Sequence, residues 1–328
     1  MPCFFFDLRH PVRNPAVKKV FIDGETGTTG LQVRERLINH PNIEVISIDP
    51  SKKRDVEEKR RLMKEADVTV LCLPDEAAID SVVLAKEEGC RILDASSVHR
   101  VAEGWVYGLP ELDVTQRDKI KNAQFVSNPG CYPTGAILLL KPLIEAGLLP
   151  ASGDYSINAI SGFSGGGNAL IERYESTDKA PIFGAYGLTF NHKHLPEMKI
   201  WSGLDKAPIF VPSVGNFRQG MLTFLPIHLK NGVTMEQLQA KLADVYANDT
   251  FVTVNDVNVI ADDAAPFLTP HDLDNSNQVE LSVLSAPDNQ SGVLVAKLDN
   301  LGKGASGAAV QNLNIMLGFD EGIAVSLR

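Results

Sequence analysis

The chain has 328 residues, of which 44% are hydrophobic, so it can bury a large core and is expected to form two domains. Its formal net charge of −10 argues against nucleic acid or an anionic membrane as the main partner, but leaves room for a local basic pocket that takes a small anion. The four cysteines lie far apart and form no C-x-x-C pair, which excludes a zinc or disulfide framework and fits a reducing cytosol.

Residues 1–15 read as an extension ahead of the first strand. The three phenylalanines at residues 4–6 are too few for the core of a signal peptide, and Asp7 follows them directly. No apolar run approaches the length of a membrane span. We therefore expect a cytoplasmic protein.

Strands and helices alternate through the first half of the chain. A short apolar strand is expected at residues 17–23, followed by a glycine loop and a helix with an apolar stripe from Leu31 to Ile38. Further strands are expected at residues 43–48, 68–73 and 91–94, with helices at residues 55–65 and 76–88. This alternation predicts an α/β fold: βαβ units in a parallel, doubly wound, Rossmann-like sheet.

The glycine loop that follows the first strand has the pattern G-x-x-G-x-x-G rather than the stricter G-x-G-x-x-G. Its backbone N–H groups and the helix N-terminus are suited to hold a pyrophosphate. The candidate cofactor-binding residues are Gly24, Thr26, Gly27, Thr28, Thr29 and Gly30. The alternative is that the glycines only let the helix pack close to the strand.

The residues after the second strand indicate which dinucleotide binds. Asp49 is an acidic side chain of the kind that binds the ribose hydroxyls of NAD. A hydroxyl and three successive cations follow it, and such groups suit the 2′-phosphate of NADP instead; they are Ser51, Lys52, Lys53 and Arg54. We expect NADP, with a solvated charged surface as the alternative.

A single cysteine lies where the chain reverses and a helix begins, in the sequence Ser-Asn-Pro-Gly-Cys-Tyr-Pro-Thr at residues 127–134. Pro129 presets its own φ, and Gly130 tolerates the positive φ that the next turn position can require. Pro133 suits a first helical turn, so the Cys131 thiol would face free N–H groups and the positive end of a helix dipole. Such surroundings lower a thiol pKa and favour a reactive nucleophile. The alternative is a small core residue.

Two histidines and a carboxylate lie within six residues, at His192, His194 and Glu197, and Pro196 suggests that a helix begins there. A metal site would need a third ligand, and no neighbouring Cys, His or Asp supplies one at a recognisable spacing. The two remaining interpretations are ordinary surface histidines and general acid/base catalysis, with Glu197 orienting an imidazole.

The second half of the chain alternates apolar and polar residues, which is typical of an α+β domain. Strands are expected at residues 221–229, 279–284 and 293–298, and a helix at residues 234–247. Pro226 should lie at an edge or a bulge, since it cannot donate to a neighbouring strand. The sheet should be open on one face, a surface suited to dimer packing. The small residues around Gly304 permit close approach of the backbone to a helix or a ligand.

Several segments occur together and in order: the glycine loop, Tyr-Gly-Leu-Pro-Glu-Leu at residues 107–112, the cysteine turn, Ser-Gly-Phe-Ser-Gly-Gly-Gly at residues 161–167, the histidine segment and the tail at residues 302–311. Together they resemble the N-acetyl-gamma-glutamyl-phosphate reductases of arginine biosynthesis, in their shorter, type 2 branch. The resemblance extends from Lys18 to Leu317.

This resemblance implies the architecture of the aspartate-semialdehyde dehydrogenase superfamily. The NADP-binding domain would comprise residues 1–127 and 302–328, with Gly304 contributing to the cofactor site. Residues 128–301 would form the catalytic and dimerisation domain. The resemblance also implies a homodimer or homotetramer.

The resemblance further implies a mechanism. The Cys131 thiolate would attack an acyl phosphate, NADPH would reduce the thioester, and an imidazole, by similarity that of His194, would handle the proton. Substrate-anion candidates are Ser96, Ser97, Arg100 and Arg218, since arginine binds phosphate or carboxylate bidentately. Alternatives are an aspartate-semialdehyde dehydrogenase, a reductase of a carrier-bound glutamyl phosphate, or an NADP-binding redox regulator.

Overall fold

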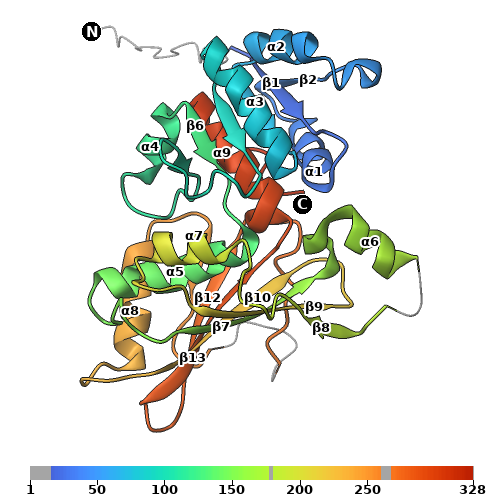
Figure 1. Cartoon of the computed structure of the whole chain (residues 1–328). Coiled ribbons are helices and arrows are strands. Elements are labelled where there is room, and N and C mark those ends of the chain that lie inside the picture. The colour runs from blue at the N-terminus through green and yellow to red at the C-terminus, as the bar shows by residue number, and fades with distance from the viewer. Residues whose placement is uncertain (1–15, 177–179, 260–266, 328) are drawn as a thin grey trace, which may run out of the picture.

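Two sheets organise the chain, one in each half of the molecule (Figure 1). The computed structural model describes residues 16–176, 180–259 and 267–327, so the expected extension at residues 1–15 lies outside the described residues. Within those ranges, no helix is both long enough and apolar enough to cross a membrane.

The first sheet has six parallel strands in the order β2-β1-β3-β4-β6-β5. The strands are β1 (Lys18–Asp23), β2 (Ile43–Ile46), β3 (Val68–Leu71), β4 (Ile92–Asp94), β5 (Val106–Tyr107) and β6 (Phe125–Ser127). The strand order reverses between β1 and β3, and the glycine loop follows β1 at this switch point, where open α/β sheets bind ligands. The predicted doubly wound α/β domain is confirmed.

Helices cover both faces of this sheet because the side chains of each strand alternate between two cores. The helices are α1 (Thr28–Leu37), α2 (Val56–Glu65), α3 (Asp75–Glu88), α4 (Gln116–Asn122) and α9 (Gly307–Leu317). Val20 and Ile22 of β1 pack with residues of α1, α4 and α9, whereas Phe21 packs with residues of α2 and α3. Helix α9 comes from the C-terminus and contacts β3 and β4, and Figure 1 shows it in red within the blue and green domain.

The second sheet has seven strands in the order β11-β12-β13-β10-β7-β9-β8, with parallel pairing only for β7–β9 and β11–β12 among the described strands. The strands are β7 (Ser156–Gly162), β8 (Phe183–Ala185), β9 (Ile209–Gly215), β10 (Met221–His228), β11 (Val252–Val254), β12 (Val279–Ser285) and β13 (Ser291–Leu298). Its helices are α5 (Cys131–Glu145), α6 (Gly167–Glu175), α7 (Leu195–Ser202) and α8 (Met235–Tyr246). All four lie on the side of the sheet that faces the first domain (Figure 1). The expected α+β domain, with one sheet face free of described helices, is confirmed.

Pro226 lies within β10, an interior strand, but at a local edge. β10 pairs with β13 along its whole length and with β7 only from Met221 to Phe224. Pro226 therefore has no partner residue in β7, and its missing N–H removes no hydrogen bond to that strand. This is the edge position that the sequence predicts. The helix expected to begin at Pro196 begins one residue earlier, at Leu195.

Candidate active site

The cysteine turn joins the end of β6 to the start of α5. Helix α5 begins at Cys131, with Gly130 as the N-cap residue. Gly130 has φ −75° and ψ 151°, so the turn does not use the positive φ that glycine tolerates. A Cβ at Gly130 would instead lie 2.7 Å from both Arg100 Nη1 and His194 Nε2. Glycine is required at this position because two polar side chains occupy the adjacent space.

Burial raises the pKa of the Cys131 thiol above its ordinary value, which corrects the expected lowering. The N–H of Tyr132 at the helix start and the charge of Arg100 act in the opposite direction, but removal of the thiolate from water outweighs both. Burial also raises the pKa of Cys72 to about 12 and raises that of Cys90. Cys131 differs from these two because it lines a cavity. Its thiol therefore needs a base to become a nucleophile.

The carboxylate of Glu197 holds the cysteine turn. Glu197 Oε1 accepts a hydrogen bond of 2.9 Å from Arg100 Nη1. Glu197 Oε2 accepts bonds of 3.0 Å from the Tyr107 hydroxyl and 3.0 Å from the backbone N–H of Gly130. These three donors occupy both oxygens, which corrects the expectation that Glu197 orients an imidazole. The sequence does not predict this role for the Tyr107 hydroxyl, because the contact joins residues 90 positions apart.

The structure distinguishes the two histidines. His194, the N-cap residue of α7, is 6% exposed, and its Nδ1 has no hydrogen-bond partner among the described residues. Burial, assisted by Arg100, lowers the pKa of His194 well below its ordinary value, so its imidazole is neutral at pH 7. His192 is half-buried, and its Nδ1 accepts a 3.2 Å bond from the His194 backbone N–H. In the described ranges, no three His, Cys, Asp or Glu side chains group to hold a metal ion.

A cavity of about 700 Å³ connects the cysteine turn to the glycine loop. Its lining includes Thr28 and Thr29 at the start of α1, and Cys131 and His194 beside the cysteine turn. Three cations also line it, with no carboxylate among the described lining residues; the cations are Arg100, Arg173 and Lys193. In a chain of net charge −10, this is a local basic pocket. It is suited to an anionic ligand.

The glycine loop fits a dinucleotide phosphate. Helix α1 begins at Thr28 with Gly27 as its N-cap residue and no side-chain cap, so the first N–H groups of the helix have no intrahelical acceptor. Gly24 has φ +90°, and a Cβ there would lie 2.3 Å from the carbonyl oxygen of Cys72. A Cβ at Gly30 would lie 2.4 Å from the carbonyl oxygen of Gly24. The glycines permit close packing, and the uncapped helix start is suited to a pyrophosphate.

The residues predicted to select NADP form an exposed segment after β2; they are Ser51, Lys52, Lys53 and Arg54. Asp49 accepts hydrogen bonds from the hydroxyl and the backbone N–H of Ser51, at 2.7 Å and 2.8 Å, and these bonds lower its pKa. The three cations form no ion pair of salt-bridge length with a described residue and are exposed, so a phosphate can reach them. Their role in binding the 2′-phosphate stays a prediction.

Of the four residues proposed to bind the substrate anion, Arg100 alone lines the cavity described here. Ser96 donates a 2.6 Å bond to Asp94, and Ser97 donates a 2.8 Å bond to Asp75. Both hydroxyls are therefore committed to carboxylates of the first domain.

Arg218 lies outside the cavity and forms an exposed ion pair with Glu175. The sequence does not predict an anion-binding role for the cavity-lining cations Arg173 and Lys193. Arg173 lies on α6, and Lys193 lies between the two histidines. An isolated cation carries no sequence signal, because only the fold shows which cavity it lines.

Gly304 brings the C-terminal segment to the cysteine. It lies in a π-helical turn, η3 (Gly302–Ser306), between β13 and α9. A Cβ at Gly304 would lie 2.7 Å from Cys131 Cβ, and both residues line the cavity. The close backbone approach expected from this small-residue segment is present.

Two family matches cover most of the chain. Residues 19–123 match the family described as semialdehyde dehydrogenase, NAD binding domain. Residues 131–300 match the family described as semialdehyde dehydrogenase, dimerisation domain.

Curated relatives match nearly the full length. The N-acetyl-gamma-glutamyl-phosphate reductase of Trichormus variabilis is 49% identical, over 92% of this chain and 98% of the relative. The reductase 2 of a Nostoc species is 48% identical over the same shares. The enzyme of a Chelativorans species is 46% identical, over 91% of this chain and 98% of the relative.

Solved structures share the fold at low identity. Aspartate semialdehyde dehydrogenase II of Vibrio cholerae gives a TM-score of 0.68 at 17% identity, covering 92% of this chain and 98% of that chain. The Candida albicans aspartate semialdehyde dehydrogenase with NADP gives 0.65 at 15% identity, with the same coverage.

Proposed function

This chain belongs to the N-acetyl-gamma-glutamyl-phosphate reductase family, and we propose that it reduces N-acetyl-L-glutamyl 5-phosphate to N-acetyl-L-glutamate 5-semialdehyde in arginine biosynthesis. NADPH is the reductant, and inorganic phosphate is released. The observation that carries the proposal is the cation-lined cavity, whose lining includes both Cys131 and the start of α1 after the glycine loop. An acyl phosphate supplies both the anion and the electrophilic carbonyl that such a cavity requires.

Cys131 is the nucleophile. Its sulfur forms a bond to the γ-carbonyl carbon of the substrate, and the bond from that carbon to the phosphate oxygen breaks, which leaves a thioester. After reduction, the thiohemiacetal collapses: the carbon–sulfur bond breaks, the aldehyde forms and the thiol is restored. The position at the start of α5 supports this role, because the N–H of Tyr132 and the charge of Arg100 both favour the thiolate.

His194 is the acid and base. Its neutral imidazole accepts the proton of the Cys131 thiol, which the raised thiol pKa makes necessary. The resulting imidazolium donates that proton to the oxygen of the reduced intermediate and takes it back during collapse. The support is geometric, because His194 Nε2 faces Gly130, the neighbour of Cys131, and His194 Nδ1 is uncommitted among the described residues.

The glycine loop and the start of α1 hold the cofactor pyrophosphate, with Ser51 to Arg54 at the ribose 2′-phosphate. When bound, NADPH supplies the hydride for the reduction. Gly304 lines the cavity beside Cys131, where a side chain would have no room.

Arg173 and Lys193 bind the substrate phosphate or carboxylate. Both line the cavity, and neither forms an ion pair with a described residue. Arg100 also lines the cavity, where its Nη1 is paired with Glu197 and its Nε has no hydrogen-bond partner among the described residues. It contributes positive charge near the reacting carbonyl.

The domain boundaries are also proposed. Residues 1–127 and 302–328 form the NADP-binding domain, and residues 128–301 form the catalytic and dimerisation domain. The end of β6 at Ser127 and the packing of α9 on the first sheet support this division. We place a homodimer or homotetramer contact on the helix-free face of the second sheet. A cytoplasmic location agrees with a nucleophile that must stay reduced.

A spectrophotometric assay tests the function. N-acetylglutamate semialdehyde, NADP and phosphate should give NADPH absorbance, and the rate should depend on all three. Aspartate semialdehyde and NAD in parallel reactions should give rates at least about tenfold lower. Equal or faster turnover of aspartate semialdehyde would reassign the substrate, and no turnover of either aldehyde would contradict the enzymatic proposal.

A further inference from the structure

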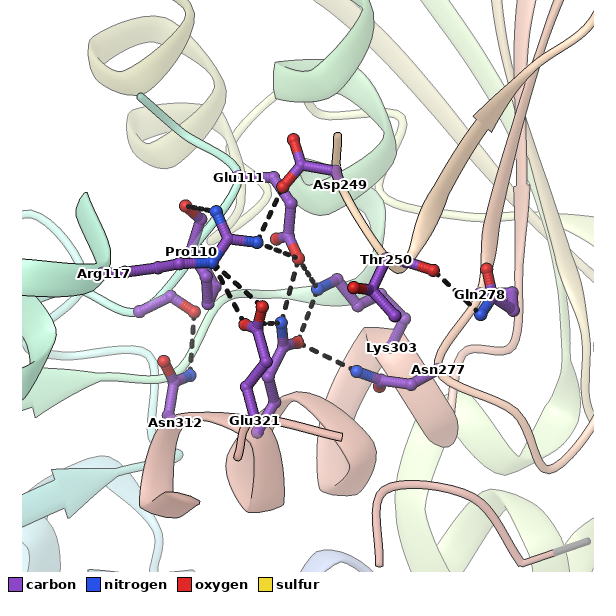
Figure 2. A network of polar contacts seen from close by, with 12 residues as sticks. Pro110, Glu111, Arg117, Asp249, Thr250, Asn277, Gln278, Lys303, Asn312 and Glu321 are labelled. Atoms are coloured by element: carbon purple, nitrogen blue, oxygen red, sulfur yellow. Dashed lines mark hydrogen bonds and ion pairs between the residues drawn. The ribbon is translucent and has the colours of Figure 1, made fainter. Parts of the chain in front are cut away.

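Lys303 precedes Gly304 in the chain, but its side chain is directed away from the cavity. Lys303 is 1% exposed and does not line the cavity, whereas Gly304 does. Lys303 Nζ lies 2.7 Å from Glu111 Oε1 and 2.6 Å from Gln311 Oε1, as Figure 2 shows for the first of these contacts. A lysine beside a cofactor-site glycine would ordinarily be read as a phosphate ligand. Here it is committed to a carboxylate inside the protein.

Glu111 is the anionic partner of this ion pair. Burial alone would raise the pKa of Glu111, but the Lys303 ammonium, with hydrogen bonds from Lys303 and Gln311, brings it below its ordinary value. Neither side chain has any exposure. Apolar residues often stabilise a core as well as a buried ion pair does, so stability alone does not account for the pair. A buried pair does fix the relative position of the segments that carry it.

The segment that carries Lys303 contacts the cysteine turn directly. Gly304 lies against Cys131, with no space for a Cβ between them. The carbonyl oxygen of Ala305 accepts a 3.0 Å bond from Asn128 Nδ2. The η3 turn therefore holds the cysteine turn at two positions, on either side of Gly130.

The segment that carries Glu111 contacts the turn from the other side. The Gly108 N–H donates a 2.8 Å bond to the carbonyl oxygen of Ser127, the residue at the end of β6. The Tyr107 hydroxyl reaches Glu197, which in turn binds the Gly130 N–H. Both segments that frame the nucleophile are thus joined by this ion pair, and α9 adds hydrogen bonds of 2.9 Å from Gln311 to Glu111 and of 2.8 Å from Asn312 to the carbonyl oxygen of Gly108.

We propose that the Lys303–Glu111 ion pair is a positioning element of the active site. It fixes η3 relative to residues 107–112 and thereby sets the position of the Cys131 sulfur. Neither residue lines the cavity that we assign to substrate and cofactor. The effect on turnover rests on the proposed function, whereas the effect on the thiol does not.

The test uses Lys303→Met, which keeps the length of the side chain and removes its charge, Glu111→Gln, and the double variant. Two quantities are measured in the full chain. The first is the rate of Cys131 alkylation by iodoacetamide across pH, followed by mass spectrometry of the Cys131 peptide. The second is kcat and KM with NADPH and substrate.

Each single variant should lower kcat by about 10- to 100-fold, the scale expected for displacement of a reacting group by about 1 Å. Alkylation of Cys131 should slow by about tenfold, and KM for NADPH should change by less than about threefold. The double variant should lose no more than Lys303→Met alone, because both changes remove the same interaction.

Val82→Ala is the matched control, because Val82 is buried in α3 on the opposite face of the first sheet. It should lower the midpoint of thermal unfolding and leave alkylation and kcat unchanged. If Lys303→Met does not fold, Glu111→Gln alone decides the question. A folded variant with wild-type alkylation and kcat, or losses that multiply in the double variant, would overturn the proposal. A wild-type chain without turnover removes the proposed function, and the alkylation result still decides this inference.

Discussion

The backbone N–H of Gly130 donates a 3.0 Å hydrogen bond to Glu197 Oε2, the same oxygen that accepts the Tyr107 hydroxyl. A carboxylate 67 residues further along the chain thereby fixes the residue that precedes the nucleophile. The other oxygen of Glu197 accepts a bond from Arg100, so one carboxylate connects the cysteine turn to two side chains of the first domain.

Replacing this carboxylate should cost both stability and rate. Glu197→Gln leaves the buried Arg100 guanidinium without its counter-charge, which should lower the free energy of unfolding by about 3–5 kcal/mol. Displacement of the cysteine turn should lower kcat by about 10- to 100-fold. Urea denaturation and steady-state kinetics measure the two effects. Glu76→Gln, at an exposed position of α3, should change neither. Loss of rate with unchanged stability would instead indicate a direct role for Glu197 in proton transfer.

Cys131→Ser should abolish turnover and leave fold and NADPH binding intact, because an ester accepts hydride far less readily than a thioester. In the wild type, iodoacetamide should modify Cys131 before Cys72 or Cys90. The thiol pKa of all three is raised and all three are partly exposed, so the His194 imidazole that lines the same cavity is the property that distinguishes Cys131. Substrate should protect it. Equal labelling of the three peptides would contradict this assignment.

The two histidines should respond differently to the same change. His194→Asn should reduce turnover by about 10²–10⁴-fold, the scale for loss of a general acid/base. His192→Asn should act mainly on KM for the acyl phosphate, since its ring lines the cavity but its Nδ1 is bonded to the backbone. Steady-state kinetics of both variants decide the roles. A nearly inactive His192 variant beside a nearly normal His194 variant would exchange them.

His194 should also make stability depend on pH. Its folded-state pKa is lowered, so below about pH 6.5 the unfolded chain binds a proton that the folded chain does not. The free energy of unfolding should therefore fall as pH decreases from about 6.5, by up to about 1.4 kcal/mol per pH unit for this group. Urea denaturation at pH 7.5, 6.5 and 5.5 measures the slope. In His194→Asn the slope should be shallower, and an unchanged slope would show that His194 is not buried in its neutral form.

Cofactor preference should reside in the segment after β2. Replacement of Lys52, Lys53 and Arg54 by alanine should raise KM for NADPH far more than KM for NADH, since each charge-assisted bond to a phosphate contributes about 1.5–3 kcal/mol. Kinetics with both cofactors provide the comparison. If both KM values rise equally, these cations are ordinary surface charges.

The sequence predicted the elements whose signals are local. The glycine loop after β1, the start of α5 at Cys131 and the alternation of strands depend on neighbours within a few residues. The roles of Tyr107 and Lys303 depend on contacts with residues 90 and 192 positions away, which no periodicity reports.

The thiol pKa shows a second limit of sequence reasoning. A helix N-terminus is visible in the sequence, and its stabilisation of a thiolate follows from the dipole. The degree to which the thiol at this position is buried depends on the packing of both domains around it. At Cys131 the removal from water has the larger effect, so the direction of the pKa shift reverses.

The position of helix α9 in the chain has a consequence for how the protein folds as it is synthesised. Its residues Ala309, Val310 and Leu313 belong to the core on one face of the first sheet. As the chain emerges from the ribosome, α1 and α4 can pack on that face, but the part that α9 covers stays exposed until residues 307–317 have been made. The first domain therefore cannot complete its fold before the second domain has been made, and a chain truncated before residue 307 should leave part of the apolar sheet face exposed, a substrate for chaperones and proteases.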